Sequence, residues 1–192
     1  MSDRLVLAST SPQRRAILEQ LRIPFEVLVP SYVEDDRPGV EPSELVRIHA
    51  VGKARSVASE GRLTLGVDTE VLLDGRVYGK PAGRDDAERM LHELSGRTHT
   101  VLSGLCLRES ELEIVGDEAT DVTFRLLAPE TIAAYVESGE WEGRAGAYAI
   151  QGFGGRLIER IEGDYLNVVG LPGALLVTLL ERHAPNLLEK PR

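Results

Sequence analysis

The sequence has little that would cross-link the chain or carry it into a membrane. Cys106 is the only cysteine among 192 residues, so no intrachain disulfide can form, which fits a reducing cytoplasm. No window approaches the roughly 20 apolar residues that a membrane-spanning helix needs. We expect no signal peptide, because the charged residues Asp3 and Arg4 precede an apolar run that is far too short. We therefore expect a cytoplasmic protein without a membrane partner.

Positive charge is also scarce. The chain carries 22 lysines and arginines against 31 aspartates and glutamates, a formal net charge of −9. This balance argues against a nucleic-acid partner, because binding to a phosphate backbone needs a basic surface. Any cationic site has to be local, within an acidic exterior. The hydrophobic content of 42% is ordinary for a globular protein, and we expect a single domain over residues 1–192.

Several familiar catalytic patterns are missing. The four histidines lack the spacing of a zinc site; His49, His92 and His183 fall in predicted helices and are expected at the surface or its boundary, and His99 falls in a strand. No serine lies in a Gly-x-Ser-x-Gly context, which leaves nucleophilic acyl chemistry with little support. Lys53 follows a glycine but not the glycine-rich run of a P-loop. Cys106 lies in an apolar run, which favours a buried small residue over a nucleophile.

Apolar periodicity predicts alternating strands and helices. Strands are expected over 5–8, 25–29, 63–66, 71–73, 76–78, 98–107, 114–126 and 157–161. Helices are expected over 12–22, 43–59, 84–95, 129–138 and 172–182. Asp74-Gly75 is a strong hairpin signal, and residues 143–155 form a glycine-rich, weakly structured stretch. Because hairpins interrupt the alternation, we predict an α/β fold with a mixed sheet flanked by helices.

The first junction between a strand and a helix has the features of an anion site. Ser11 is a good N-cap and Pro12 suits the first helical position, so free backbone N–H groups point outward from the strand's end. Arg14 and Arg15 add full charges in a turn where the helix dipole disfavours them, which suggests a bound phosphate. The candidate residues here are Ser9, Ser11, Gln13, Arg14 and Arg15. A capped helix with surface arginines is the alternative interpretation.

Two groups of carboxylates are candidates for chemistry. Asp68 follows a short strand beside the hydroxyl of Thr69, where it could serve as a general base or a metal ligand, although turn-forming aspartates are common. The loop Glu34-Asp35-Asp36 could hold Mg²⁺ against a polyphosphate, or could be a solvated run of charge.

Two lysines and one glutamine complete the candidates. Lys53 lies on the second predicted helix, and Lys80 lies between a glycine and a proline that fix its direction. Gln151 lies within the glycine-rich stretch, where its paired donor and acceptor groups could read a base edge. The same glycines could equally form only a turn.

Six segments together closely resemble the Maf family, nearly from end to end and in the expected order. They are Leu-Ala-Ser-Thr-Ser-Pro-Gln-Arg-Arg at 7–15, Gly-Val-Asp-Thr at 66–69, Leu-Asp-Gly-Arg-Val-Tyr-Gly-Lys-Pro at 73–81, Leu-Ser-Gly-Arg-Thr-His at 94–99, Ala-Gly-Ala-Tyr-Ala-Ile-Gln-Gly at 145–152 and Gly-Asp-Tyr-Leu-Asn-Val-Val-Gly-Leu-Pro at 163–172. The resemblance implies a nucleoside triphosphate pyrophosphatase, which releases a nucleoside monophosphate and pyrophosphate. It also implies the elongated mixed α/β fold of the inosine-triphosphatase-like (Maf/Ham1) superfamily, with a cleft between two lobes, and often a homodimer.

The resemblance assigns roles in hydrolysis and phosphate binding. It maps Asp68 as the general base that activates water. Ser11 and Arg14 fall on a Ser-x-x-Arg phosphate-binding element, with Lys53 and Lys80 as further phosphate contacts. Cleavage of the α–β phosphoanhydride bond needs such a base, cations on the triphosphate and a divalent metal, here Mg²⁺ or Mn²⁺.

The remaining assignments concern the metal and the base. Glu34 and Asp35 fall on the acidic pair near the metal, while Gln13, Thr69 and Gln151 fall on positions that tune base choice. The Asp-Thr and Ile-Gln-Gly elements resemble the branch that acts on dTTP and UTP. That branch usually has arginine at the position of Gln13, and the 7-methyl-GTP branch has tryptophan. A preference for 7-methyl-GTP and a nucleotide-binding regulator of cell division without turnover are the alternatives.

Overall fold

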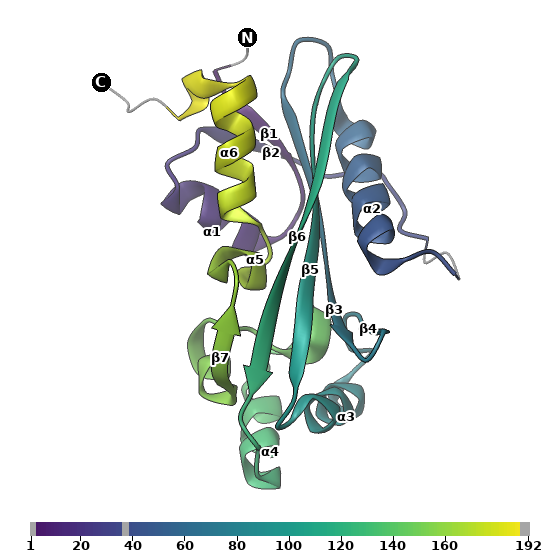
Figure 1. The fold of residues 1–192 in the computed structure, drawn as a ribbon, viewed down its shortest axis with the longest axis vertical. Helices are drawn as coiled ribbons and strands as arrows, with labels where there is room; N and C mark the ends of the chain where they lie inside the picture. The colour runs from purple at the N-terminus through teal and green to yellow at the C-terminus, as the bar shows by residue number, and fades with distance from the viewer. Residues whose placement is uncertain (1–2, 36–38, 189–192) are drawn as a thin grey trace. The chain divides into compact units, whose positions relative to one another are not determined.

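The computed structural model describes residues 3–35 and 39–188, in which strands and helices alternate (Figure 1). The strands are β1 (Leu5–Ala8), β2 (Phe25–Leu28), β3 (Thr64–Leu73), β4 (Arg76–Tyr78), β5 (Thr98–Glu109), β6 (Leu112–Phe124) and β7 (Ile158–Glu162). The α-helices are α1 (Pro12–Gln20), α2 (Pro42–Val57), α3 (Arg84–Leu94), α4 (Pro129–Ser138), α5 (Tyr165–Val169) and α6 (Gly173–His183). Three short 3₁₀ turns are η1 (Ala145–Ala147), η2 (Gly152–Leu157) and η3 (Pro185–Leu187). None of the described helices is both long and apolar enough to cross a membrane.

The strands form one mixed sheet, which confirms the predicted α/β class. Its order is β2-β1-β3-β5-β6-β7, and β4 pairs with β3 outside this path. β1 is parallel to both β2 and β3, whereas β3 with β4 and β6 with β7 are antiparallel. The Asp74-Gly75 turn that joins β3 to β4 has positive φ at both residues, as the hairpin signal predicted.

One prediction about the elements was wrong, and one helix was not predicted. The structure has one continuous ten-residue strand, β3, where two short strands over 63–66 and 71–73 were expected. Polar Asp68, Thr69 and Glu70 looked like a break, but the sheet pairs the backbone on both sides of them. The five-residue helix α5 was not expected, because it is too short to show a helical apolar period.

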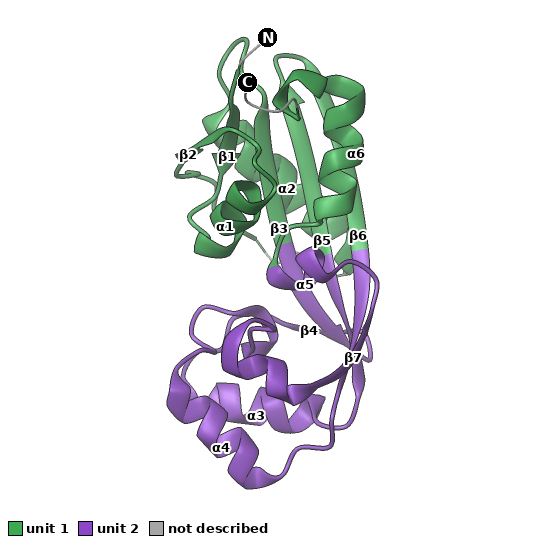
Figure 2. Cartoon of the chain, turned by 90° about the vertical axis from the view of Figure 1, so that its left-hand side faces the viewer, with its two compact units in different colours: residues 1–68, 103–118, 170–192 green, residues 69–102, 119–169 purple. Residues whose placement is uncertain are grey.

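Contacts divide the chain into two compact units, coloured separately in Figure 2. Unit 1 comprises residues 1–68, 103–118 and 170–192; unit 2 comprises residues 69–102 and 119–169. β3, β5 and β6 each contribute one part to either unit, so the predicted single domain has two packing centres.

Unit 1 has its strands covered on both faces. β1 is buried at all four positions, as expected for a strand between two layers of helix. α2 lies on one face of these strands, and α1 and α6 lie on the other (Figures 1 and 2). The continuous apolar run of the first strand therefore has a simple cause, because neither of its faces meets water.

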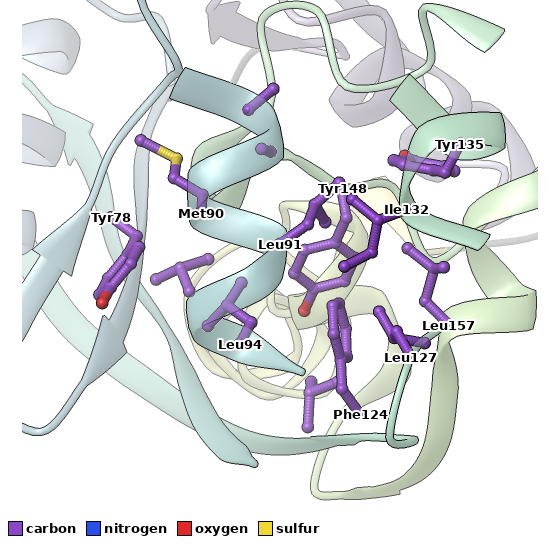
Figure 3. Packing of buried hydrophobic residues seen from close by; sticks show 14 of the residues in the cluster. Tyr78, Met90, Leu91, Leu94, Phe124, Leu127, Ile132, Tyr135, Tyr148 and Leu157 are labelled. Carbon is purple, nitrogen blue, oxygen red and sulfur yellow. The ribbon is translucent and has the colours of Figure 1, made fainter. Parts of the chain in front are cut away.

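Unit 2 has a separate core that is rich in aromatic side chains. Its buried cluster joins β3, β4, β5 and β6 to α3, α4 and the segment from Ala147 to Leu157. Tyr148 and Phe124 lie near its centre, and Tyr135 comes in from α4 (Figure 3). Much of the glycine-rich stretch is thus fixed by packing rather than loose.

Candidate active site

The junction between β1 and α1 has the local geometry that the sequence predicted. Ser11 is the N-cap of α1, and its Oγ accepts a hydrogen bond from the backbone N–H of Arg14 at 3.5 Å. Pro12 occupies the first helical position, and the first turn holds no acidic residue. The N-terminal N–H groups of α1 are therefore not neutralised by a carboxylate of their own turn.

Arg14 is directed inward and fixed by polar partners. Its Nη1 donates to the Oγ of buried Ser9 at 3.2 Å, and its Nε donates to the carbonyl of Gly170 at 2.9 Å. Burial lowers the pKa of Arg14, and the nearby negative charges of Asp68 and Glu34 raise it. Arg15, in contrast, is exposed, so only one of the two adjacent arginines is directed into the protein.

Gln13 contacts the helix cap. The hydroxyl of Ser11 donates to its Oε1 at 3.1 Å, and the side chain is half-buried. Gln13 thus shares a hydrogen bond with Ser11, the candidate phosphate ligand at the cap of α1.

An ion-pair cluster in unit 1 joins Lys53 to two carboxylates. Lys53 Nζ lies 2.5 Å from Asp68 Oδ1 and 2.6 Å from Glu34 Oε1. The side chains of Lys53 and Asp68 are only 10% and 6% exposed, whereas that of Glu34 is 45% exposed. One lysine from α2 therefore links a buried carboxylate at the middle of β3 to a carboxylate at the surface.

Close packing of α2 on β3 brings Lys53 to Asp68. A Cβ on Gly66 would lie 2.0 Å from the carbonyl oxygen of Ala50 and 2.8 Å from the backbone nitrogen of Ala54. Only a glycine permits this approach between strand and helix. Gly66 precedes Asp68 by two residues, and Lys53 lies between the two alanines on α2, so the contact sets the register of the ion pair.

The acidic loop reaches this cluster through Tyr32. The ring of Tyr32 lies over Gly52, where an added Cβ would be 2.3 Å from its Cε2, and its hydroxyl lies 3.0 Å from Nδ1 of His49. His49 is buried, so the expectation of a surface or boundary histidine was wrong; its partner lies on a loop, outside any helical pattern. Tyr32 anchors the segment that presents Glu34 to Lys53.

The other carboxylates of this loop are less defined. Asp35 is exposed on the same segment, and the predicted metal candidate Asp36 lies outside the described residues. Among residues 3–35 and 39–188, no group of three or more histidines, cysteines and carboxylates is arranged to hold a metal ion.

Three predicted site residues belong to unit 2. Thr69 is half-buried on β3, and Lys80 and Gln151 are both exposed. The backbone N–H of Gly146 donates to the carbonyl of Gly79 at 3.2 Å, which ties the segment carrying Lys80 to the segment carrying Gln151. The structure therefore links the two segments at Gly146 and Gly79, with Lys80 next to one end of this bond and Gln151 five residues from the other.

The family described as Maf-like protein matches residues 4–183.

The chain belongs to the Maf family.

Relatives of this Maf-family chain are similar over nearly their whole length. A dTTP/UTP pyrophosphatase from Gloeobacter violaceus is 48% identical over 182 residues, which cover 94% of this chain and 96% of the relative. Proteins of the same name from Symbiobacterium thermophilum and Nitratidesulfovibrio vulgaris are 50% and 49% identical, covering 88% and 93% of this chain and 89% and 87% of their own lengths.

A solved structure supports the predicted fold. The HAM1 protein from Coxiella burnetii matches with a TM-score of 0.51 over 93% of this chain and 98% of its own, at 16% sequence identity. At this identity the likeness concerns the fold alone. The predicted Maf/Ham1 type of mixed α/β fold is confirmed.

The candidate site of this Maf-family chain has donors that suit a hard divalent cation. Asp68 Oδ2 is buried and has no hydrogen-bond partner among the described residues, since Lys53 engages only Oδ1. An orphaned carboxylate oxygen is costly unless a ligand or water uses it. Carboxylate oxygens are the donors that Mg²⁺ and Mn²⁺ prefer, so Asp68 with Glu34 fits the implied metal.

Sequence reasoning missed Tyr32 and the role of His49. One signal was present, because an isolated glycine inside a helical pattern, Gly52, often marks a close approach of another group. The sequence could not say which group approaches. Cys106 met its expectation, since it is buried and burial raises the pKa of its thiol to about 12.

Proposed function

We propose that this chain is a nucleoside triphosphate pyrophosphatase that hydrolyses dTTP and UTP to the monophosphate and pyrophosphate. The relatives that carry this name, similar along almost their full lengths, support the reaction class. The observation that carries the proposal is the buried Lys53–Asp68 pair with Glu34 beside it, since both carboxylates also act on Arg14 near the N-terminus of α1.

The positively charged groups of the candidate site bind the polyphosphate. The N-terminus of α1, capped by Ser11, and the guanidinium of Arg14 attract phosphate oxygens by charge and by hydrogen bonding. Ser9 orients Arg14 through its hydroxyl. Lys53 and Lys80 supply further positive charge, which stabilises the negative charge that develops during phosphoryl transfer.

Asp68 activates water. Lys53 holds Oδ1, and this leaves Oδ2 to take a proton from a water molecule. The water oxygen forms a bond to one phosphorus of the α–β anhydride, the bridging P–O bond breaks, and its electron pair leaves with the departing phosphate group. The products are the nucleoside monophosphate and pyrophosphate.

Glu34, Asp35 and Asp68 are the proposed ligands of Mg²⁺ or Mn²⁺. When bound, such an ion neutralises phosphate charge and polarises the phosphoryl oxygens. In the described structure, Lys53 Nζ lies between Glu34 and Asp68, so a cation there would share its carboxylates with the lysine.

Gln13, Thr69 and Gln151 are proposed to choose the base. The side chain of Gln151 can donate and accept at once, as a pyrimidine edge requires. The hydroxyl of Ser11 occupies the acceptor oxygen of Gln13, which leaves the amide N–H groups of Gln13 for the substrate.

Pyrophosphate release by the wild type and by Asp68→Asn tests the proposal. We expect turnover of dTTP and UTP with Mg²⁺ or Mn²⁺, and a loss of about 10³-fold in kcat for the variant, within the range of general base catalysis. Asp74→Asn, at an exposed residue of the β3–β4 turn that pairs only with Arg97 at the surface among the described contacts, is the matched control. Reaction in ¹⁸O-labelled water shows which phosphorus is attacked.

Each other outcome overturns a stated part of the proposal. Full activity of Asp68→Asn would remove Asp68 as the base. Faster turnover of 7-methyl-GTP than of dTTP and UTP would overturn the substrate while leaving the reaction class. Tight nucleotide binding with no pyrophosphate release across a metal series would favour the nucleotide-binding regulator instead.

A further inference from the structure

The segment that carries Gln151 is fixed on both sides while Gln151 itself stays exposed. Ala149 and the run Phe153-Gly154 flank it, and the backbone N–H groups of all three donate to side chains at the C-terminal end of α4. This pattern is unusual for a turn, where local backbone bonds normally suffice. One helix end therefore controls where Gln151 lies.

Tyr135 and Glu140 are the two acceptors, and together they are called the clamp. The hydroxyl oxygen of Tyr135 accepts from Ala149 N at 3.0 Å. Glu140, just beyond the helix, accepts from Phe153 N through Oε1 and from Gly154 N through Oε2, each at 3.0 Å. Hydrogen bonds to an ionised carboxylate are stronger than those between neutral groups, so Glu140 is the stronger part of the clamp.

The glycines of this segment fit the clamp. A Cβ on Gly152 would lie 2.7 Å from Glu140 Oε1, and a Cβ on Gly154 would lie 1.9 Å from the carbonyl oxygen of Ala149. Gly152 also has a φ of +70°. The glycine pattern that looked like a generic turn is therefore the space that Glu140 and Ala149 need.

Other contacts hold the far side of the segment but do not reach Gln151. Tyr148 lies in the aromatic core (Figure 3), and its hydroxyl lies 2.8 Å from Nε2 of His99. Both contacts of Glu140, by contrast, fall within three residues of Gln151. Loss of Glu140 should therefore free the Gln151 side of the segment and leave the core side in place.

We propose that Glu140 is a positioning residue for base recognition, which sets the selectivity of the enzyme by holding Gln151 although it touches no substrate itself. This inference rests on the proposed function, because it takes Gln151 as a reader of the base.

Glu140→Gln is the sharpest test. It keeps the size of the side chain but replaces one acceptor oxygen by an NH₂ group that faces a backbone N–H donor. We expect KM for dTTP and UTP to rise about tenfold, the cost of one charged hydrogen bond, with kcat within about threefold of the wild type. The preference for UTP over CTP and GTP should fall toward that of Gln151→Ala.

Two further variants separate positioning from a general loss of structure. Glu142→Gln, an exposed change in the turn after α4 and two residues from Glu140, is expected to behave as the wild type. The double variant Glu140→Gln/Gln151→Ala should lose no more selectivity than Gln151→Ala alone, because both changes act on one contact. Equal changes for every base, a lower kcat with unchanged selectivity, or additive losses in the double variant would each overturn the proposal.

The positioning role can still be tested if Glu140→Gln does not fold or if the wild type shows no turnover. If Glu140→Gln does not fold, Tyr135→Phe removes the acceptor for Ala149 N and should give the same shift in selectivity, although a smaller one. If the wild type turns over no nucleotide, the proposed function fails by itself. Titration calorimetry with dTTP and dGTP then asks the same question, and unchanged selectivity of binding in Glu140→Gln would overturn the positioning role.

Discussion

The two units hold their candidate site residues by different means. In unit 1, the candidates contact one another, because Lys53 binds both Asp68 and Glu34, and Ser11 binds Gln13. In unit 2, Gln151 is exposed and only the backbone beside it is held, by Glu140 and others.

Substitutions at the candidate residues should therefore affect stability differently in the two units. In unit 1 the buried charges compensate each other, so removing one leaves its partner charge in surroundings that stabilise ions poorly. Exposed candidates in unit 2 are solvated without their ligand, and their loss costs the fold little. We expect stability and activity to be linked in unit 1 and separable in unit 2.

Two lysine variants should give the largest contrast. Lys53→Met leaves Asp68 buried without its closest counter-ion, and we expect the free energy of unfolding to fall by about 3 to 5 kcal/mol. Lys80→Met, at an exposed position, should change it by less than about 0.5 kcal/mol. Both should slow pyrophosphate release from dTTP. Urea denaturation and a pyrophosphate assay measure the two effects.

The predicted difference between the units is wrong if the two lysine variants have the same free energy of unfolding. Equal stabilities would mean that the Lys53–Asp68 contact contributes nothing to the fold. A stable Lys53→Met with full activity would also remove Lys53 from the phosphate-binding set.

The stability of the folded chain should depend on pH through His99, which is buried in the core of unit 2. Burial lowers the pKa of His99 to about 4 from 6.5, an effect that Asp121 partly opposes. The unfolded chain therefore binds the proton more readily, and the stability of the neutral form is present above pH 6.5 and lost as the pH falls toward 4.

His99→Gln removes this titration. As the pH falls between these two values, we expect the free energy of unfolding of the wild type to drop by about 3 kcal/mol more than that of the variant. The measurement is denaturant unfolding at a series of pH values, with exposed His92→Gln as the control. Parallel curves for wild type and His99→Gln would contradict a buried neutral imidazole.

The contact between Gly52 and the ring of Tyr32 should have a smaller effect on stability. The sign of that effect should depend on whether the ring is present. Gly52→Ala gains about 1 kcal/mol of helix propensity, but its Cβ overlaps the ring of Tyr32, which costs about 2 kcal/mol. We expect a net loss of about 1 kcal/mol and faster hydrogen exchange over residues 30–35. In a Tyr32→Ala background the same change should stabilise by about 1 kcal/mol. Destabilisation in both backgrounds would show that Tyr32 is not what Gly52 accommodates.

Local signals in the sequence predicted the elements well. Ser11 and Pro12 marked the start of α1, Asp74-Gly75 marked a hairpin, and Gly139 followed α4 in the left-handed conformation. Such signals act within a few residues, so they are readable along the chain. The buried strands and the mixed sheet followed from apolar runs and hairpins, and the six family segments supplied the Maf assignment. The homodimer, the metal and the cytoplasmic location stay predictions.

The sequence by itself determined which residue types are available: one cysteine, a local cluster of cations in an acidic chain, and the motifs that identify the family. The tertiary structure decided which of them meet. It chose Arg14 over Arg15, buried Lys53 against Asp68, turned His49 inward to Tyr32, and assigned Glu140 to the segment of Gln151. The contacts of Lys53 and His49 join residues 15 to 19 positions apart, and the packing of α2 against β3 and against the loop of Tyr32 and Glu34 brings these residues within hydrogen-bonding distance.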